Sequence, residues 1–208
     1  AEASTPRDKR GLSGFRLLPD GDEGLAARQA LLHLAQKSLD VQYYLIAADD
    51  TGRQFLRALR DAAQRGVRVR LLVDDLHADA RDEVFTGLAA HPNVQVRLFN
   101  PLPVRSGSRT TRVLFSLHDF DRINRRMHNK LFIADNTFAV TGGRNVADEY
   151  FMRGSSANFI DMDMLSSGPV VRELSGVFDS FWNSELAFPI GVLDATDLAP
   201  GAARDRFD

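Results

Sequence analysis

The sequence predicts an α/β fold in which a mixed, largely parallel sheet is flanked by helices on both faces. First, 44% of the 208 residues are hydrophobic and 26% are charged, which is typical of a folded globular domain. Second, apolar β-type runs alternate with amphipathic stretches of about 10 to 15 residues, a pattern typical of parallel strands joined by helices. Third, two short apolar runs later in the chain flank a turn signal, which predicts an antiparallel hairpin.

The first half of the chain predicts four strands and three helices. Leu25, Leu31 and Leu32 recur at helical spacing after a Pro-Asp-Gly-Asp turn. Asp50 and Thr51 precede a second amphipathic stretch as a cap, and Gly66 is suited to end it. The expected strands cover residues 15–18, 39–46, 67–73 and 94–99, and the expected helices cover residues 23–37, 50–66 and 80–90.

The second half predicts three further strands, at residues 130–134, 138–141 and 160–165, and a helix over residues 169–186. Asp135, Asn136 and Thr137 form the turn signal between the first two of these strands. Pro169 suits the first turn of the helix. Residues 1–11 are expected to be a flexible leader, residues 12–187 a single domain, and residues 188–208 a linker toward a second half beyond this sequence.

Composition excludes several kinds of chemistry. The chain has no cysteine, which rules out thiolate catalysis, zinc sites with thiolate ligands and disulfides. No apolar run approaches the roughly 20 residues that a membrane-spanning helix needs. The formal net charge is −2, so global charge gives no reason to expect binding to nucleic acid. Positive charge is concentrated locally between Arg105 and Lys130, and its run Arg122, Arg125 and Arg126 is typical of a solvated surface.

One polar cluster carries the chemistry. His128 and Lys130 are two residues apart on an expected strand, so they share a face. A hairpin after that strand would bring Gly142, Gly143 and Asn145 beside them. An ammonium group, an amide and glycine N–H groups can hold a phosphoryl group, and a neutral imidazole can attack phosphorus. The sequence therefore predicts a phosphoryl-transfer site.

These residues form the pattern His-x-Lys-x4-Asp-x6-Gly-Gly-x-Asn, which resembles the signature motif of the phospholipase D superfamily. Further stretches, including 142–151 and 161–171, most resemble the amino-terminal half of bacterial cardiolipin synthases of the C type. The resemblance implies a phospholipase D-like fold and an enzyme that transfers phosphatidyl groups through a phosphohistidine intermediate.

The resemblance also implies roles for individual residues. His128 would be the nucleophile or else the acid that protonates the leaving oxygen. Lys130, Asn145 and Gly143 would bind the phosphate oxygens. Asp161 would accept a hydrogen bond from the other ring nitrogen of His128 and so fix its tautomer.

Two motif residues are expected to act structurally: Asp135 to organise the turn, and Gly142 to allow close approach of the backbone. No metal and no cofactor are implied, because the lysine supplies the positive charge. Simpler alternatives remain for other residues. Asp161 and Asp163 could form a solvated strand face, and Tyr43 and Tyr44 are expected to pack in a strand.

The chain contains only one such motif, whereas enzymes of this superfamily use two. Either two copies of the chain pair, or a second half follows residue 208, and the second alternative is favoured. The isolated monomer is expected to be weak or inactive. The implied partners are a phospholipid, a membrane surface and the second half or copy, with a place in the bacterial cell envelope, peripheral at the inner membrane. The other candidate functions are a homodimeric phosphodiesterase acting on nucleic acid and a non-catalytic phosphate-binding half domain.

Overall fold

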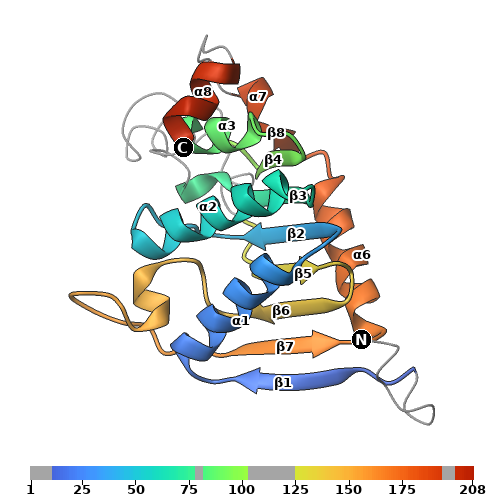
Figure 1. Ribbon diagram of the computed structural model, residues 1–208. Coiled ribbons are helices and arrows are strands. Elements are labelled where there is room, and N and C mark those ends of the chain that lie inside the picture. The colour runs from blue at the N-terminus through green and yellow to red at the C-terminus, as the bar shows by residue number, and fades with distance from the viewer. Residues whose placement is uncertain (1–10, 78–81, 103–124, 194–199) are drawn as a thin grey trace.

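The computed structural model describes residues 11–77, 82–102, 125–193 and 200–208 (Figure 1). The strands are β1 (Gly14–Leu18), β2 (Ser38–Tyr43), β3 (Arg68–Asp74), β4 (Val94–Phe99), β5 (Leu131–Ala134), β6 (Phe138–Gly142), β7 (Asp163–Ser167) and β8 (Ala187–Pro189). The α-helices are α1 (Gly21–Leu34), α2 (Asp50–Gln64), α3 (Asp82–Ala89), α6 (Val170–Trp182), α7 (Ile190–Leu193) and α8 (Pro200–Phe207). Two short 3-10 helices are η3 (Asp75–His77) and η5 (Asp148–Phe151).

In the described part of the chain, eight strands form one mixed sheet in the order β1-β7-β6-β5-β2-β3-β4-β8. The predicted mixed α/β sheet is confirmed, but its parallel share is smaller than expected. Parallel pairing is confined to β2-β3 and β3-β4, and the remaining pairs are antiparallel. The reason is that α2 and α3 are the only crossovers here that join neighbouring strands. β5, β7 and β8 run opposite to β2, β3 and β4, whereas β6 and β1 run in the same direction as these three but have only antiparallel neighbours.

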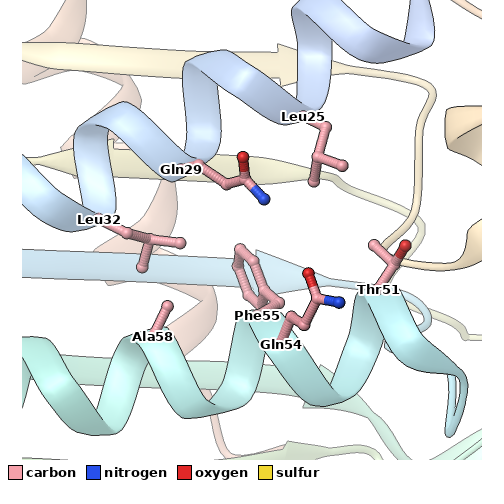
Figure 2. Close-up of a pocket in the computed structure, with 7 residues that line it drawn as sticks. All are labelled: Leu25, Gln29, Leu32, Thr51, Gln54, Phe55 and Ala58. Atoms are coloured by element: carbon pink, nitrogen blue, oxygen red, sulfur yellow. The ribbon is translucent and has the colours of Figure 1, made fainter.

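Helices cover both faces of the sheet, as predicted (Figure 1). Side chains alternate along the strands, so β3, β4, β5 and β6 each contribute to two cores. On one face Val41, Leu71 and Phe132 pack beneath α1, α2 and α3, and on the other Leu131 and Ile133 pack against α6. A small pocket lies where α1 and α2 face each other, lined by Leu25, Gln29, Leu32, Thr51, Gln54, Phe55 and Ala58 (Figure 2). None of these seven residues belongs to the predicted phosphoryl-transfer site.

The start of α2 is fixed to the segment that follows β6. Asp49 caps the helix by accepting from Gly52 N at 2.8 Å, and its other oxygen accepts from Asp148 N at 2.7 Å. Asp148 in turn accepts from Thr51 N at 3.0 Å. A Cβ at Gly52 would overlap the carbonyl of Ala47, so only glycine fits there. These reciprocal bonds hold η5 against α2, at the edge where the predicted site lies.

Most of the described part of residues 188–208, the segment expected to be a linker, is folded against the domain as β8, α7 and α8. β8 extends the sheet beside β4, and α8 packs on α3. Ile190 and Ala203 are buried, and a Cβ added at Gly87 of α3 would come within 2.8 Å of Phe207 Cβ. Pro189, Gly191, Pro200 and Gly201 interrupt this segment, so no continuous periodic pattern revealed the packing. The expected leader lies outside the described residues except for Gly11.

Candidate active site

The predicted site residues converge at one edge of the central strands. His128 and Lys130 immediately precede β5, and Asn145 follows β6. β5 runs antiparallel to both β2 and β6, so the start of β5 lies beside the ends of these two strands. Tyr44 follows β2, and Asp161 precedes β7, which pairs antiparallel with β6. Four segments of the fold therefore bring their polar residues to one edge of the sheet.

Asp135 lies at the opposite end of β5, where it organises the hairpin. It and Asn136 have positive φ angles of 53° and 49°, and Thr137 N donates to Ala134 O at 2.9 Å, as in a type I′ turn. The Asp135 carboxylate also accepts from the backbone N–H groups of residues 36, 37 and 38. Partial burial acts to raise its pKa, but these bonds outweigh it and hold the pKa below the ordinary value.

His128 is exposed, whereas Lys130 is 4% exposed and reaches back to it. Lys130 Nζ lies 3.0 Å from His128 Nδ1 and donates to the His128 carbonyl at 2.7 Å. The ring of Tyr44 completes the cluster, with its centroid 4.8 Å from the His128 ring and 5.4 Å from Lys130 Nζ. Thr141 on β6 donates to the Lys130 carbonyl at 3.0 Å, which ties this segment to the hairpin.

The electrostatics of this pair favour a neutral imidazole. Partial loss of solvent around the ring, which packs against Tyr44, and the charge of Lys130 both lower the pKa of His128. Burial also lowers the pKa of Lys130, while the nearby charge of Asp161 acts to raise it. A neutral His128 keeps a lone pair with which it can attack phosphorus, and the ammonium beside it can bind the phosphoryl oxygens.

Asn145 is 3% exposed and held by two hydrogen bonds. Its Oδ1 accepts from Leu45 N at 3.2 Å, and its Nδ2 donates to the hydroxyl of Tyr150 at 2.9 Å. Backbone bonds between residues 45–47 and 146 hold the two chain segments together. The amide of Asn145 is therefore fixed between the end of β2 and η5, with one further N–H available as a donor.

The two glycines allow carboxylates to lie against the β6 backbone. A Cβ at Gly142 would overlap Asp163, and a Cβ at Gly143 would overlap the carboxylate of Asp161. The structural role expected of Gly142 fits this arrangement. Gly143 was expected to offer its N–H group to phosphate, but that N–H donates to Met162 O at 3.2 Å. Gly143 instead provides space for Asp161.

Asp161 lies outside β7, two residues before its first residue. Its Oδ1 accepts from Met162 N at 2.7 Å, and its charge acts on Lys130. The hydrogen bond expected between Asp161 and His128 does not form in this structure, because Lys130 Nζ occupies the contact with Nδ1. Asp161 thus interacts with the cluster through the electrostatic attraction between its carboxylate and Lys130.

Asp163 is not on a solvated face but at the centre of a buried ion-pair network. Its side chain is fully buried, and its Oδ2 lies 2.8 Å from Arg28 Nη1 and 3.3 Å from Arg144 Nη1. Arg28 also donates to the Tyr43 hydroxyl at 2.7 Å. Arg144 donates to the Asp161 carbonyl and to Leu18 O, so the network holds the backbone of the site carboxylate.

Several of these residues were missed or misplaced by sequence reasoning. Tyr44 was expected to pack within a strand with Tyr43, but only Tyr43 is buried in β2. Arg28, Arg144 and Tyr150 were not singled out. Arg144 stands inside the Gly-Gly-x-Asn pattern, a position that could have drawn attention to it.

The predicted basic run is only partly described. Arg126 lies 3.2 Å from the buried carboxylate of Asp74, so it is engaged within the fold, whereas Arg125 is exposed. Arg122 and residues 105–121 fall outside the described residues. Over the described ranges, no three His, Asp or Glu side chains are grouped as metal ligands. No helix within those ranges is long and apolar enough to cross a membrane.

Comparisons with known sequences find similarity to cardiolipin synthases. A family model described as "Cardiolipin synthase, PLD-like domain" matches residues 29–182. Cardiolipin synthase C of Escherichia coli is 39% identical over 198 residues, which covers 95% of this chain and 41% of that protein. Cardiolipin synthase A of Pseudomonas fluorescens is 32% identical over 182 residues, covering 86% of this chain and 36% of that protein. The chain spans about two fifths of the length of these relatives.

Solved structures share the fold at low sequence identity. Phosphatidylserine synthase of Haemophilus influenzae matches with a TM-score of 0.64 at 15% identity, over 93% of this chain and 42% of that one. NucT of Helicobacter pylori matches with a TM-score of 0.58 at 16% identity, over 86% of this chain and 98% of that one. At this identity the likeness is one of fold alone.

Proposed function

The chain belongs to the family of phospholipase D-like domains of cardiolipin synthases, as the sequence resemblance predicted, and we propose that it supplies one half of a site that transfers phosphatidyl groups. The observation that carries this proposal is the exposed His128 ring beside the buried ammonium of Lys130. The substrate would be a phospholipid, which the names of the relatives favour over a nucleic acid. The net charge of −2 also gives no reason to expect a nucleic acid substrate.

The reaction would proceed in two displacements. A ring nitrogen of His128 attacks the phosphorus of the phospholipid, an N–P bond forms, and the bond to the headgroup oxygen breaks. The leaving alkoxide takes a proton from a general acid. A second alcohol, or water, then attacks the phosphohistidine and gives its proton to the conjugate base of that general acid, and the N–P bond breaks to restore His128. Lys130 and the free N–H of Asn145 bind the nonbridging oxygens throughout.

Asp161 would act during the first step as a positioning residue. Phosphate oxygens compete with His128 Nδ1 for the Lys130 ammonium, which frees the ring nitrogen. Asp161 lies close enough to act on Lys130 electrostatically, and its carboxylate could turn from Met162 N to accept from Nδ1. That bond would stabilise the imidazolium character of the attacking ring.

The general acid must come from outside the described site. His128 cannot attack phosphorus on one side and protonate the leaving group on the other. We infer that a second motif supplies the acid, either from a further half of a longer chain or from a second copy. The sequence coverage of about two fifths of the relatives fits a longer chain.

The experiment is a turnover assay with the protein in its full-length context. Phosphatidylglycerol vesicles and single-stranded DNA are supplied in parallel, each with excess chelator, and the native protein is compared with His128→Ala. We expect phosphatidyl transfer or hydrolysis from the lipid, loss of both in the variant, and no DNA cleavage. DNA cleavage without lipid turnover would establish the nucleic acid phosphodiesterase instead. No turnover of either substrate would favour a non-catalytic phosphate-binding domain.

A further inference from the structure

We infer that the loop between η5 and β7 carries a lipid-contacting surface. This surface contacts the acyl chains of a membrane while the phosphate group of the phospholipid is bound in the candidate active site. This inference rests on the proposed function, because it assigns the substrate's apolar portion to a surface beside the same site. The surface, called the apolar rim, consists of Met152, Phe159, Ile160 and Met162.

The four residues of the apolar rim are much more exposed than large apolar residues usually are in a folded protein. Ile160 is 97% exposed, Met152 59%, Phe159 51% and Met162 50%. Isolated exposed apolar side chains are common, but a group on one loop marks an interaction surface. The loop projects beyond the sheet at the edge where β6 ends and β7 begins (Figure 1). That is also the edge at which the site residues converge.

The loop is held in place at its base. Phe159 N donates to Glu149 O at 2.8 Å, Arg153 N donates to Asp148 O at 2.9 Å, and Asn158 accepts from Gly154 N at 2.8 Å. These bonds close the loop onto η5, which is itself bonded to the start of α2. The exposed apolar side chains are therefore presented by an anchored loop.

The apolar rim adjoins the candidate active site at two points. Asp161, whose charge acts on Lys130, stands directly between Ile160 and Met162. The Phe159 ring lies 5.0 Å from the ring of Tyr150, whose hydroxyl accepts from Asn145. A phosphodiester bound by Lys130 and Asn145 would thus have apolar side chains at its border. The glycerol and acyl portion of a phospholipid has the chemistry to fill that position.

The positive charge of Arg153 in this loop also favours a phospholipid surface as the partner. Arg153 is exposed and adjoins Met152. Apolar side chains next to a cation are typical of segments that lie at the surface of anionic membranes, where the cation contacts phosphate groups. The loop's one carboxylate, Asp161, acts on Lys130, which leaves Arg153 as the charge beside the four apolar side chains. This combination fits a lipid surface better than the flat face of a folded partner.

The first experiment places a fluorescent reporter in the rim of the full chain. Ile160→Trp is compared with Val192→Trp, a matched control at a position that is 73% exposed on α7. The native Trp182 is buried and gives a constant background. With phosphatidylglycerol vesicles brominated on the acyl chains, we expect a blue shift and quenching for Ile160→Trp alone. An unshifted, unquenched Ile160→Trp at vesicle concentrations where the protein is bound would overturn the inference.

The second experiment separates this inference from the proposed function. Ile160→Ser should weaken sedimentation with phosphatidylglycerol vesicles about tenfold, since a fully buried isoleucine side chain contributes at least that factor, and Val192→Ser should not. The ratio of turnover on vesicles to turnover on a monomeric short-chain phospholipid should fall similarly.

The outcomes are distinct. If no lipid is turned over but Ile160→Ser still weakens vesicle binding, the proposed function fails and the lipid surface stands. If Ile160→Ser leaves vesicle binding unchanged, the inference is wrong. A lower molecular mass by light scattering for Ile160→Ser, with vesicle binding unchanged, would instead assign the rim to a protein interface.

Discussion

Replacing Arg28 by methionine tests whether the buried ion-pair network holds the fold around the site. The side chains of Arg28 and Asp163 are 1% and 0% exposed and lie 2.8 Å apart. Removing one partner of such a pair leaves an uncompensated buried charge, which typically costs about 3 to 5 kcal/mol. Arg144 remains 3.3 Å from the same carboxylate oxygen, so we expect Arg28→Met to cost about 3 kcal/mol.

The assay is urea unfolding at neutral pH, followed by circular dichroism, with Arg16→Met as the matched control. Arg16 and Glu23 lie 3.1 Å apart, a similar separation, but on the surface with side chains that are 67% and 40% exposed. An exposed pair contributes at most about 1 kcal/mol. Equal losses of stability in Arg28→Met and Arg16→Met would refute the reasoning.

A double variant sharpens the result. Arg28→Met with Asp163→Asn removes the charge that Arg28→Met leaves unpaired, so it should regain part of the stability lost in the single variant. A simple sum of the two single losses would show that the two residues are not coupled. Because Arg144 bonds both Asp163 and the Asp161 carbonyl, the single variants should also lower turnover.

Three further outcomes are expected. Lys130→Met should raise the pKa of His128, measured by NMR of labelled histidine, because Lys130 lowers it in the native protein; an unchanged or lower value would contradict the electrostatic account. Asp135→Asn should lower the free energy of unfolding at neutral pH. The pKa of Asp135 is depressed by folding, so its contribution is present above about pH 4 and is lost as the pH falls through the folded-state pKa. The gap between variant and native protein should therefore shrink in acid, and a constant gap would count against the carboxylate's role. Turnover should persist in excess chelator, since Lys130 and Asn145 supply the phosphate contacts; complete loss that one divalent ion restores would exclude this site.

Local periodicity was enough to predict most of the individual elements. The helical spacing of Leu25, Leu31 and Leu32 corresponds to α1, and the apolar run at residues 67–73 corresponds to β3. The turn at Asp135 and Asn136 predicted the hairpin β5-β6, because both residues tolerate positive φ. The phospholipase D-like fold class was confirmed, since the motif and its flanking stretches identified the family.

Pairing between distant segments was not predictable from the same patterns. β1 pairs with β7 at the edge of the sheet, about 150 residues away along the chain, and no local signal records that choice. Arg28 and Asp163 are separated by 135 positions, so their contact is likewise invisible to periodicity. The segment expected to be a linker is interrupted by Pro189, Gly191, Pro200 and Gly201, so it shows no long helical stripe, although Ala203 is buried against the domain.

Sequence reasoning anticipated that the motif residues lie near one another, but not the contacts that they make. The hairpin brings His128, Lys130 and Asn145 to the same edge, as the spacing of the motif suggested. The Gly143 amide is bonded to Met162 O, and Asp161 contacts the cluster through Lys130, because the chain between β6 and β7 folds back on β6. The contribution of each to turnover stays a prediction.

The most direct test of the proposed chemistry is to detect the covalent intermediate. The full-length protein is mixed with phosphatidylglycerol, quenched with base within a turnover, and its peptides are examined by mass spectrometry. We predict a phosphoryl-linked adduct on His128 that is stable to base and labile to acid, and that is absent from His128→Asn. Continued lipid turnover by His128→Asn, or an adduct on a different residue of this chain, would contradict the assignment of His128 as the nucleophile.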